Sequence, residues 1–206
     1  MKTFVYIDGF NLYYGCLKGT PHRWLNPAEL CRFMLPGHDI AALHYFTARI
    51  SGRPSDPQAP NRQQIYLRAL RTVPNLQITL GFFLAHDVLM PRADPKGAGK
   101  MALVIRTDEK GSDVNLASHL LMDAFDDRFE CAVLITNDSD LAFPVRCVRQ
   151  RFGKQVGILN PQKRPSRTLA SCSDFFKQIR AGVLARSLFP DTLRDRHGEF
   201  HKPAGW

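Results

Sequence analysis

The chain has 206 residues, of which 44% are hydrophobic and 23% charged, a composition typical of folded globular proteins and unlike that of disordered or fibrous ones. Lysine and arginine together number 28 against 19 aspartate and glutamate, and the resulting formal charge of +9 favours a polyanionic partner such as nucleic acid. The length suits one hydrophobic core, so we expect one domain over residues 1–186 and a C-terminal tail over residues 187–206 that packs on the domain or extends from it.

The cysteines and the apolar runs bear on where the protein works. The five cysteines are scattered, odd in number and free of any Cys-x-x-Cys pair, which argues against a disulfide framework and a zinc site. The apolar run at the N-terminus is too short for the core of a signal peptide, and no stretch reaches the ~20 apolar residues of a membrane span. We therefore expect a cytoplasmic protein with reduced thiols and no membrane partner.

Strands and helices are predicted to alternate along the chain. Short runs rich in β-branched and aromatic residues predict strands at residues 4–7, 41–47, 76–84, 102–107, 131–135 and 156–159. Apolar residues at helical spacing lie between them, in one stripe of Tyr66, Leu70 and Val73 and in another of Val114, Ala117, Leu121 and Ala124. This alternation predicts an α/β fold, a Rossmann-like three-layer α/β/α sandwich with a mostly parallel central sheet.

The remaining segments are predicted to be loops and a last helix. Residues 51–60 hold three prolines, and residues 86–100 combine prolines and glycines with Arg92, Lys96 and Lys100. Both are predicted surface loops, and the second is a candidate guide for substrate. A final helix is predicted at residues 174–185, followed by the polar tail.

Acidic residues follow three of the predicted strands. Asp8 ends the first strand, Asp113 comes after the fourth, and Asp138 and Asp140 come after the fifth. Each acid on its own has a local explanation as a turn residue or a helix cap, and Asn11 is placed to cap the first helix. Because ligands of parallel sheets bind at the carboxyl ends of the strands, the three positions together predict a carboxylate cluster.

A cluster of carboxylates is unfavourable unless a cation neutralises it. Ligation by carboxylate oxygens suits Mg²⁺ or Mn²⁺, which take their remaining ligands from water and from phosphate oxygens. The pattern therefore favours metal-dependent hydrolysis of a phosphodiester.

Three blocks of sequence resemble the signature of NYN-domain proteins, which are relatives of PIN-domain ribonucleases. They are Tyr-Ile-Asp-Gly-Phe-Asn at residues 6–11, Glu-Lys-Gly-Ser-Asp-Val-Asn-Leu-Ala at 109–117 and Ile-Thr-Asn-Asp-Ser-Asp-Leu at 135–141. The resemblance spans residues 4–159 and implies a PIN-like fold. The family's metal-binding acids then fall on Asp8, Asp113, Asp138 and Asp140, and its accompanying asparagine falls on Asn11. Asn137 stands where relatives often have glycine, and His119 where they often have a further acid.

The resemblance implies a metal-dependent endoribonuclease that acts on single-stranded RNA in preference to DNA. Mg²⁺ or Mn²⁺ would activate water and stabilise charge on the phosphate, while Ser139 and Asn11 orient waters or phosphate oxygens. Lys110, Lys163 and Arg164 are candidates for holding the nucleic-acid backbone, and a homodimer would lengthen the groove. A module that binds RNA or protein without cutting is the alternative, and the sequence leaves it open.

Overall fold

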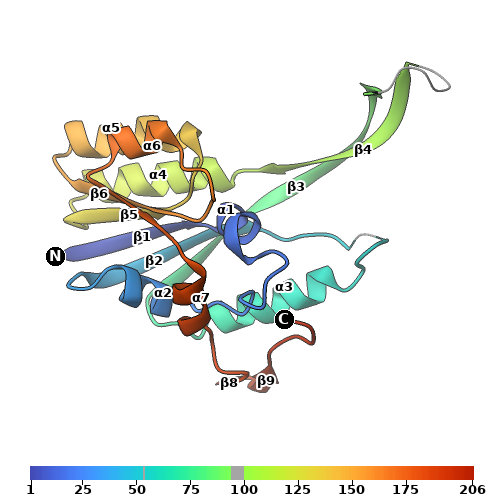
Figure 1. Cartoon of the computed structure of the whole chain (residues 1–206), viewed down its shortest axis with the longest axis horizontal. Helices are drawn as coiled ribbons and strands as arrows, with labels where there is room; N and C mark the ends of the chain where they lie inside the picture. Colours follow the sequence, from blue (N-terminus) through green and yellow to red (C-terminus); the bar gives the residue numbers. More distant parts are fainter. Residues whose placement is uncertain (53, 94–99) are drawn as a thin grey trace.

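The structure is a computed structural model that describes residues 1–52, 54–93 and 100–206. A seven-stranded sheet in the order β4-β3-β2-β1-β5-β6-β7 forms its centre, with helices on both faces (Figure 1). Neighbouring strands of this sheet run parallel except for β3 and β4. The predicted three-layer α/β/α sandwich with a mostly parallel sheet is confirmed.

The strands are β1 Lys2–Asp8, β2 Asp39–Ala48, β3 Leu76–Pro91, β4 Met101–Lys110, β5 Cys131–Ile135, β6 Gln155–Asn160, β7 Phe175–Gln178, β8 Thr192–Asp195 and β9 Gly198–His201. The helices are α1 Gly9–Leu12, continued by the π-helix η1 Tyr13–Leu17, then α2 Pro27–Met34, α3 Ala59–Leu70, α4 Ser112–Phe125, the 3₁₀ helix η2 Ser139–Leu141, α5 Ala142–Gln150, α6 Arg167–Cys172 and α7 Ala181–Arg186. Each of the six predicted strands has its counterpart among β1 to β6.

Two cores lie on opposite faces of the sheet, and the central strand β1 supplies both. Val5 and Ile7 belong to the core that α2, α3 and α7 cover, whereas Phe4 and Tyr6 belong to the core under α4, α5 and α6. Every residue of β1 after Lys2 is buried. A strand that is covered on both faces reads as a continuous apolar run, which is why residues 4–7 were recognisable in the sequence.

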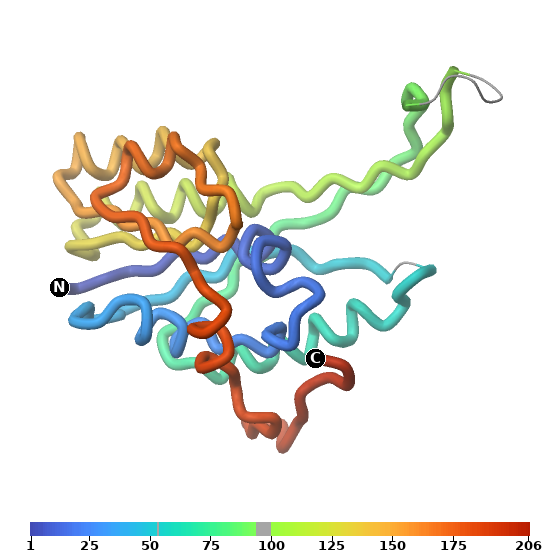
Figure 2. The backbone as a smooth tube through the Cα atoms, in the orientation of Figure 1, coloured from blue at the N-terminus to red at the C-terminus, as the bar shows by residue number. Residues whose placement is uncertain are grey.

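The prediction of a loop at residues 86–100 is wrong for residues 86–91, and residues 94–99 lie outside the described part of the chain. β3 continues to Pro91 and pairs antiparallel with β4 from Phe82↔Lys110 out to Pro91↔Met101. This two-stranded ribbon, called the arm below and comprising residues 82–91 and 101–110, projects from the body of the protein (Figures 1 and 2). Arg92 and Lys100 are exposed at its end, and Lys96 lies outside the described residues.

The predicted last helix at residues 174–185 is also wrong in its first half. Residues Phe175–Gln178 form β7, the edge strand beside β6, and only Ala181–Arg186 are helical. The aromatic pair Phe175 and Phe176 has high strand propensity, and an edge of the sheet was free to accept it. Tertiary pairing therefore decided the conformation of this segment.

The C-terminal residues pack on the domain as an antiparallel hairpin, β8 with β9, followed by an aromatic anchor. Phe200 is buried in the first core, and the Trp206 ring lies 6.4 Å from that of Trp24 and 5.8 Å from that of Tyr66. Arg68 of α3 forms an ion pair with Asp195 at 2.7 Å. Figure 2 shows this segment beside α3, so the residues after 186 lie against the domain.

Helix α4 buries part of the predicted stripe. Ala124 lies in the second core and Ala117 and Leu121 pack against it, whereas Val114 is exposed. Leu116, Leu120 and Asp123, which were not in the predicted stripe, are also buried. The buried Asp123 accepts a hydrogen bond from the Tyr6 hydroxyl at 2.8 Å and pairs with Arg128 at 2.7 Å. Asp123 can be buried because its carboxylate is hydrogen-bonded and ion-paired. A search of the sequence for apolar residues at helical spacing does not find such a position.

Candidate carboxylate site at the carboxyl edge of the sheet

Asp8 is the last residue of β1 and lies at the centre of the carboxyl edge of the sheet. Only 5% of its surface is exposed. One carboxylate oxygen accepts the Asn11 backbone N–H at 2.8 Å, so Asp8 is the N-cap of α1. The other oxygen accepts the Thr136 hydroxyl at 3.1 Å. The sequence had given the capping role to Asn11, and that assignment is wrong.

The tight turn after Asp8 explains the glycine at position 9. A Cβ atom on Gly9 would lie 2.7 Å from the Phe46 carbonyl oxygen and 2.7 Å from the Tyr45 ring. Only glycine therefore lets α1 leave the sheet this close to β2. The turn holds Asp8 beside the ends of β2 and β5.

Asp138 and Asp140 follow β5, the strand next to β1. Asp138 is the N-cap of η2, and its carboxylate accepts the Asp140 backbone N–H at 3.0 Å. Its own backbone N–H donates to the Thr136 hydroxyl at 3.1 Å. Thr136 thus connects Asp8 and Asp138, and Asp140 and Ser139 are exposed at the rim.

Asp113 reaches the same edge by a different route. The parallel part of β3 ends at Gly81, the chain runs out along the arm, and β4 returns it to Lys110 beside Phe82. Helix α4 therefore begins at the carboxyl edge although β4 runs antiparallel. Gly111, in the left-handed conformation with φ of 96°, is the N-cap, so Asp113 in the first turn is not the capping residue.

Electrostatics show that these acids lie close together. Burial raises the pKa of Asp8 to about 6, and the charges of Asp113 and Asp138 add to the rise against the hydrogen bonds from Asn11 and Thr136. The pKa of Asp113 is also raised, by desolvation first and then by Asp138, Glu109 and Asp140. Negative charge therefore accumulates at this edge, from Asp8 at the centre to Asp140 at the rim.

Four polar residues that the sequence left without a role support the acids. Glu109 accepts hydrogen bonds from both the backbone N–H and the hydroxyl of Ser112, and Thr136 bridges two of the acids. Gln162 donates to the Asn11 side-chain oxygen at 3.4 Å, and the Asn137 N–H donates to the same oxygen at 3.1 Å. Thr136 follows directly after a strand, which was the signal that could have identified it.

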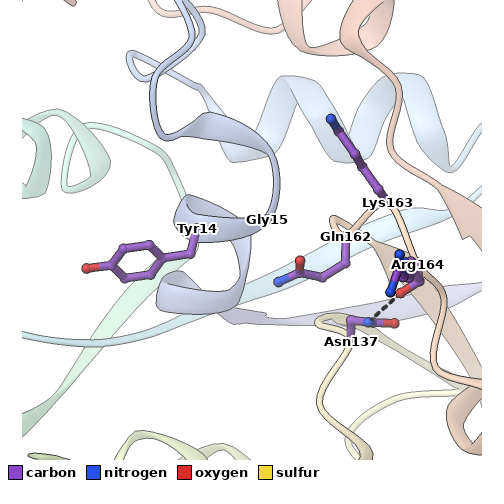
Figure 3. Close-up of a pocket in the computed structure, with 6 residues that line it drawn as sticks. All are labelled: Tyr14, Gly15, Asn137, Gln162, Lys163 and Arg164. Atoms are coloured by element: carbon purple, nitrogen blue, oxygen red, sulfur yellow. Dashed lines mark hydrogen bonds between the residues drawn. The ribbon is translucent and has the colours of Figure 1, made fainter. Parts of the chain in front are cut away.

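An open pocket of about 550 Å³ lies beside Asn137, the residue before Asp138, and Tyr14, Gly15, Asn137, Gln162, Lys163 and Arg164 line it (Figure 3). The Asn137 side chain donates to the Arg164 carbonyl oxygen at 2.9 Å and accepts from the Ser166 N–H at 2.7 Å. Asn137 thereby fixes the loop that carries both cations, a role that glycine at this position could not perform. Among the described residues, neither Lys163 nor Arg164 forms an ion pair, and Lys110 is exposed at the end of β4.

His119 lies away from the rim. Its partly buried ring packs against those of Phe46, at 5.5 Å, and His44, at 5.7 Å, in the interior between α4 and the sheet. His119, which stands where relatives often have a further acid, therefore packs in the interior and does not replace that acid at the rim.

The fit of the site to a metal ion depends on donor chemistry. Among residues 1–52, 54–93 and 100–206, no group of three or more His, Cys, Asp or Glu side chains is arranged so that it could hold a metal ion. The donors are nevertheless carboxylates, and for Asp8 and Asp113 the charges of neighbouring acids add to the effect of burial in raising the pKa, a repulsion that a divalent cation relieves. This donor set suits Mg²⁺ or Mn²⁺ that keep several of their waters.

The fold and the site define an α/β protein with an acidic carboxyl edge of the PIN-like nuclease type. The model of the NYN domain family matches residues 2–184, and the chain belongs to this family. The chain is 29% identical over 240 residues to 6-hydroxy-3-succinoylpyridine 3-monooxygenase HspA from Pseudomonas putida (strain DSM 28022 / S16), an alignment that covers 100% of this chain and 75% of that protein.

One solved structure supports the fold. A protein of unknown function from Vibrio parahaemolyticus superposes with a TM-score of 0.57 and 20% identity over 87% of this chain and 93% of the other. At this identity the likeness establishes the fold alone. No helix in the described part of this chain is long and apolar enough to cross a membrane.

Proposed function

We propose that this protein is a metal-dependent endoribonuclease that hydrolyses phosphodiester bonds in single-stranded RNA. The observation that carries the proposal is the meeting of Asp8, Asp113 and Asp138 at one edge of the sheet, where burial raises the pKa of Asp8 and the charges of Asp113 and Asp138 add to the rise. An acidic edge of this kind beside unpaired cations suits a phosphate-bearing substrate with a divalent ion. Membership of a PIN-like nuclease family adds to this support.

The metal ligands in this proposal are Asp8, Asp113, Asp138 and Asp140. When bound there, Mg²⁺ or Mn²⁺ supplies an activated water and stabilisation of the charge that develops on the phosphate. Without a cation, Asp8 with its pKa of about 6 holds a proton over part of the range below neutral pH. Cation binding then displaces this proton, so metal affinity and activity rise between pH 5 and 7, as expected for about one proton released.

The other residues of the edge bind and orient substrate. The Asn11 side-chain oxygen accepts two hydrogen bonds, which fixes the amide and leaves its NH₂ group to donate to water or to a phosphate oxygen. Ser139, exposed at the start of η2, offers a hydroxyl at the same rim. Lys163 and Arg164 attract the RNA backbone on one side of the acids and Lys110 on another. The five cysteines carry free thiols, in keeping with a reducing cytoplasm.

The test is cleavage of end-labelled single-stranded RNA and DNA by the full chain with Mn²⁺, Mg²⁺ or EDTA. We expect cutting of RNA with either metal and none with EDTA. Asp138→Asn and the double variant Asp8→Asn, Asp113→Asn should each lower the rate by about 100-fold or more, the equivalent of a few kcal/mol of transition-state stabilisation. Asp126→Asn is the matched control, because Asp126 is exposed at the opposite end of α4.

The outcomes of this test separate the proposal from its alternative. Cutting that persists in both carboxylate variants would locate the activity elsewhere or in a contaminant. Tight RNA binding without cutting in any metal would instead identify a binding module that uses the same edge without hydrolysis.

A second candidate function follows from the similarity to the pyridine monooxygenase and from the size of the pocket. A volume of about 550 Å³ is typical of small-molecule sites. Its cations and its Gln162 amide suit a substrate that carries a carboxylate and polar ring atoms, as 6-hydroxy-3-succinoylpyridine does. Incubating the protein with this compound, O₂ and a reduced nicotinamide, and following loss of the pyridine, tests the candidate. Turnover that Lys163→Gln and Arg164→Gln abolish, with no RNA cleavage, would replace the nuclease proposal.

A further inference from the structure

The arm is the part of the molecule that neither core covers. Within the residues that the structure describes, β3 pairs with β2 over Leu76–Gly81 and the arm has no neighbouring strand on its β3 side. None of its described residues belongs to either hydrophobic core. An isolated two-stranded ribbon is marginally stable in water, so an arm of ten residue pairs needs a covering surface.

The ladder of the arm sorts its side chains onto two faces, because directly opposite residues point to the same side. One face holds Phe82, Leu84, Val88, Met90, Ala102 and Val104 together with the ionisable His86, Arg106, Asp108 and Lys110. The other, called the apolar face below, holds Pro91, Leu89, Met101, Leu103 and Ile105 over its outer half. Asp87, opposite Ile105, is the ionisable residue that lies beside these five on the same face.

The apolar face is large enough to be an interface. Leu89 is 61% exposed, Met101 46%, Leu103 68% and Ile105 75%. Together these side chains offer roughly 500 Å² per copy, so two such faces in contact would bury about 1,000 Å², the lower bound for a specific protein–protein interface. Contiguous apolar patches of this size mark interaction sites on soluble proteins.

We propose that the apolar face of the arm packs against the same face of a second copy of this chain, forming a two-fold symmetric dimer through its arms. A two-fold axis at the Leu89–Leu103 pair sets the two ribbons antiparallel and brings Leu103 of each copy next to its mate. The same arrangement sets Asp87 of each copy opposite Pro91 of the other, at the two ends of a centre formed by Leu89, Leu103 and Ile105.

Charge also selects this face over the other. The chain carries +9, so two copies associate most readily where few like charges meet. The face with Arg106, Lys110 and His86 would bring basic groups together, although the Arg106–Asp108 pair at 2.9 Å neutralises part of that charge. The apolar face has no basic side chain between Pro91 and Asp87. This inference rests on the arm alone and does not depend on which reaction the carboxylate edge performs.

The experiment measures the mass of the full chain by sedimentation across micromolar concentrations. The wild type should sediment as a dimer. Leu103→Glu and Leu103→Lys should each raise the dissociation constant by about 100-fold or more, because two like charges then meet at the axis away from water. An equimolar mixture of the two variants should recover the dimer, since opposite charges meet there.

Phe125→Glu is the matched control, because Phe125 is 76% exposed on α4, outside the arm, and this variant should remain a dimer. Circular dichroism establishes that each variant is folded. A monomeric wild type would overturn the proposal, and so would a dimer that Leu103→Glu leaves intact or a mixture that stays monomeric. A monomer whose RNA affinity falls with Leu103→Glu would also overturn it, and would assign the arm to nucleic acid.

Discussion

The two halves of strand β3 are both rich in apolar residues but lie in opposite environments. Residues 76–81 pair with β2 and lie in the sheet, where Leu76 and Ile78 pack against the first core. Residues 82–91 continue in the same direction with comparable apolar content, yet Phe82 and Leu89 are 62% and 61% exposed. The difference in exposure comes from the neighbouring strands. β2 ends at Ala48, and in the part of the chain that the structure describes no other strand continues on that side of residues 82–91.

The change of environment at Gly81 also positions the carboxylate edge. The body of the sheet stops where β2 ends, and the arm carries the chain out and back before α4 begins. Asp113 thereby arrives beside Asp8 and Asp138. The body supplies a fixed edge with buried charge, whereas the arm supplies exposed apolar surface. Substitutions at the carboxylate edge should therefore change stability by changing buried charge. Substitutions in the arm should change the association of two copies of the chain.

The largest effect on stability is expected from the buried charge at the edge. The folded-state pKa of Asp8, about 6, lies above its ordinary value of 3.8, so the folded protein retains a proton that the unfolded chain loses. The free energy of unfolding of the wild type therefore falls as pH rises from about 4 to about 6. The Asp8→Asn variant has no carboxyl group to ionise at this position and keeps its stability as the pH rises. Above pH 6 it should therefore be more stable than the wild type by on the order of 3 kcal/mol.

Urea unfolding in EDTA near pH 7.5 and near pH 4 checks this expectation, and the two proteins should converge at the lower pH. Asp126→Asn, at an exposed position, serves as the control and should show no such dependence. A stability difference that is the same at both pH values would mean that Asp8 carries no buried charge. Added Mn²⁺ should raise the stability of the wild type at the higher pH and leave Asp8→Asn less affected.

A matched pair of substitutions compares the body with the arm directly. Ile78→Thr replaces the ethyl branch of a side chain packed on the first core with a hydroxyl, and should cost about 1–2 kcal/mol of unfolding free energy. Ile105→Thr changes a side chain that is 75% exposed and should stay within about 0.5 kcal/mol in dilute protein. Equal costs in dilute protein would show that the arm is covered within one chain. A cost of Ile105→Thr that grows with protein concentration would show that a second copy covers it.

The smallest effect concerns the cations beside the edge. Lys163→Gln and Arg164→Gln should each weaken RNA binding by about 1 kcal/mol at low salt and reduce the salt dependence of affinity by about one ion. Arg151→Gln, which changes an exposed cation at the C-terminal end of α5, should leave the slope unchanged. Fluorescence anisotropy with labelled RNA across a salt series measures both quantities. If all three variants show the same salt dependence of RNA affinity as the wild type, Lys163 and Arg164 do not contact the RNA backbone.

The sequence predicted the edge of the sheet at which the acids of the candidate site lie, because of the strands that they follow. Asp8, Asp138 and Asp140 follow strands whose apolar runs are continuous, and parallel strands end at a common edge. Asp113 was placed there by its position after a strand, although β4 runs against the others and only the return of the arm brings its end to that edge. The capping role predicted for Asn11 was wrong, because Asp8 is the N-cap of α1. The local explanation of Asp113 as a cap does not hold either, because Gly111 is the N-cap of α4.

The sequence by itself determined the order of strands and helices, the two-sided burial of β1 and the location of the acids, because each is recorded in local periodicity or in the residue that follows a strand. Only the tertiary structure decided which segments pair with another strand and which side chains stay exposed. Residues 86–91 were predicted to belong to a loop, and residues 175–178 to a helix. Both segments form strands, because residues 86–91 pair with β4 and residues 175–178 pair with the edge of the sheet at β6. Pairing between distant segments depends on the whole fold and leaves no mark in a short window of sequence.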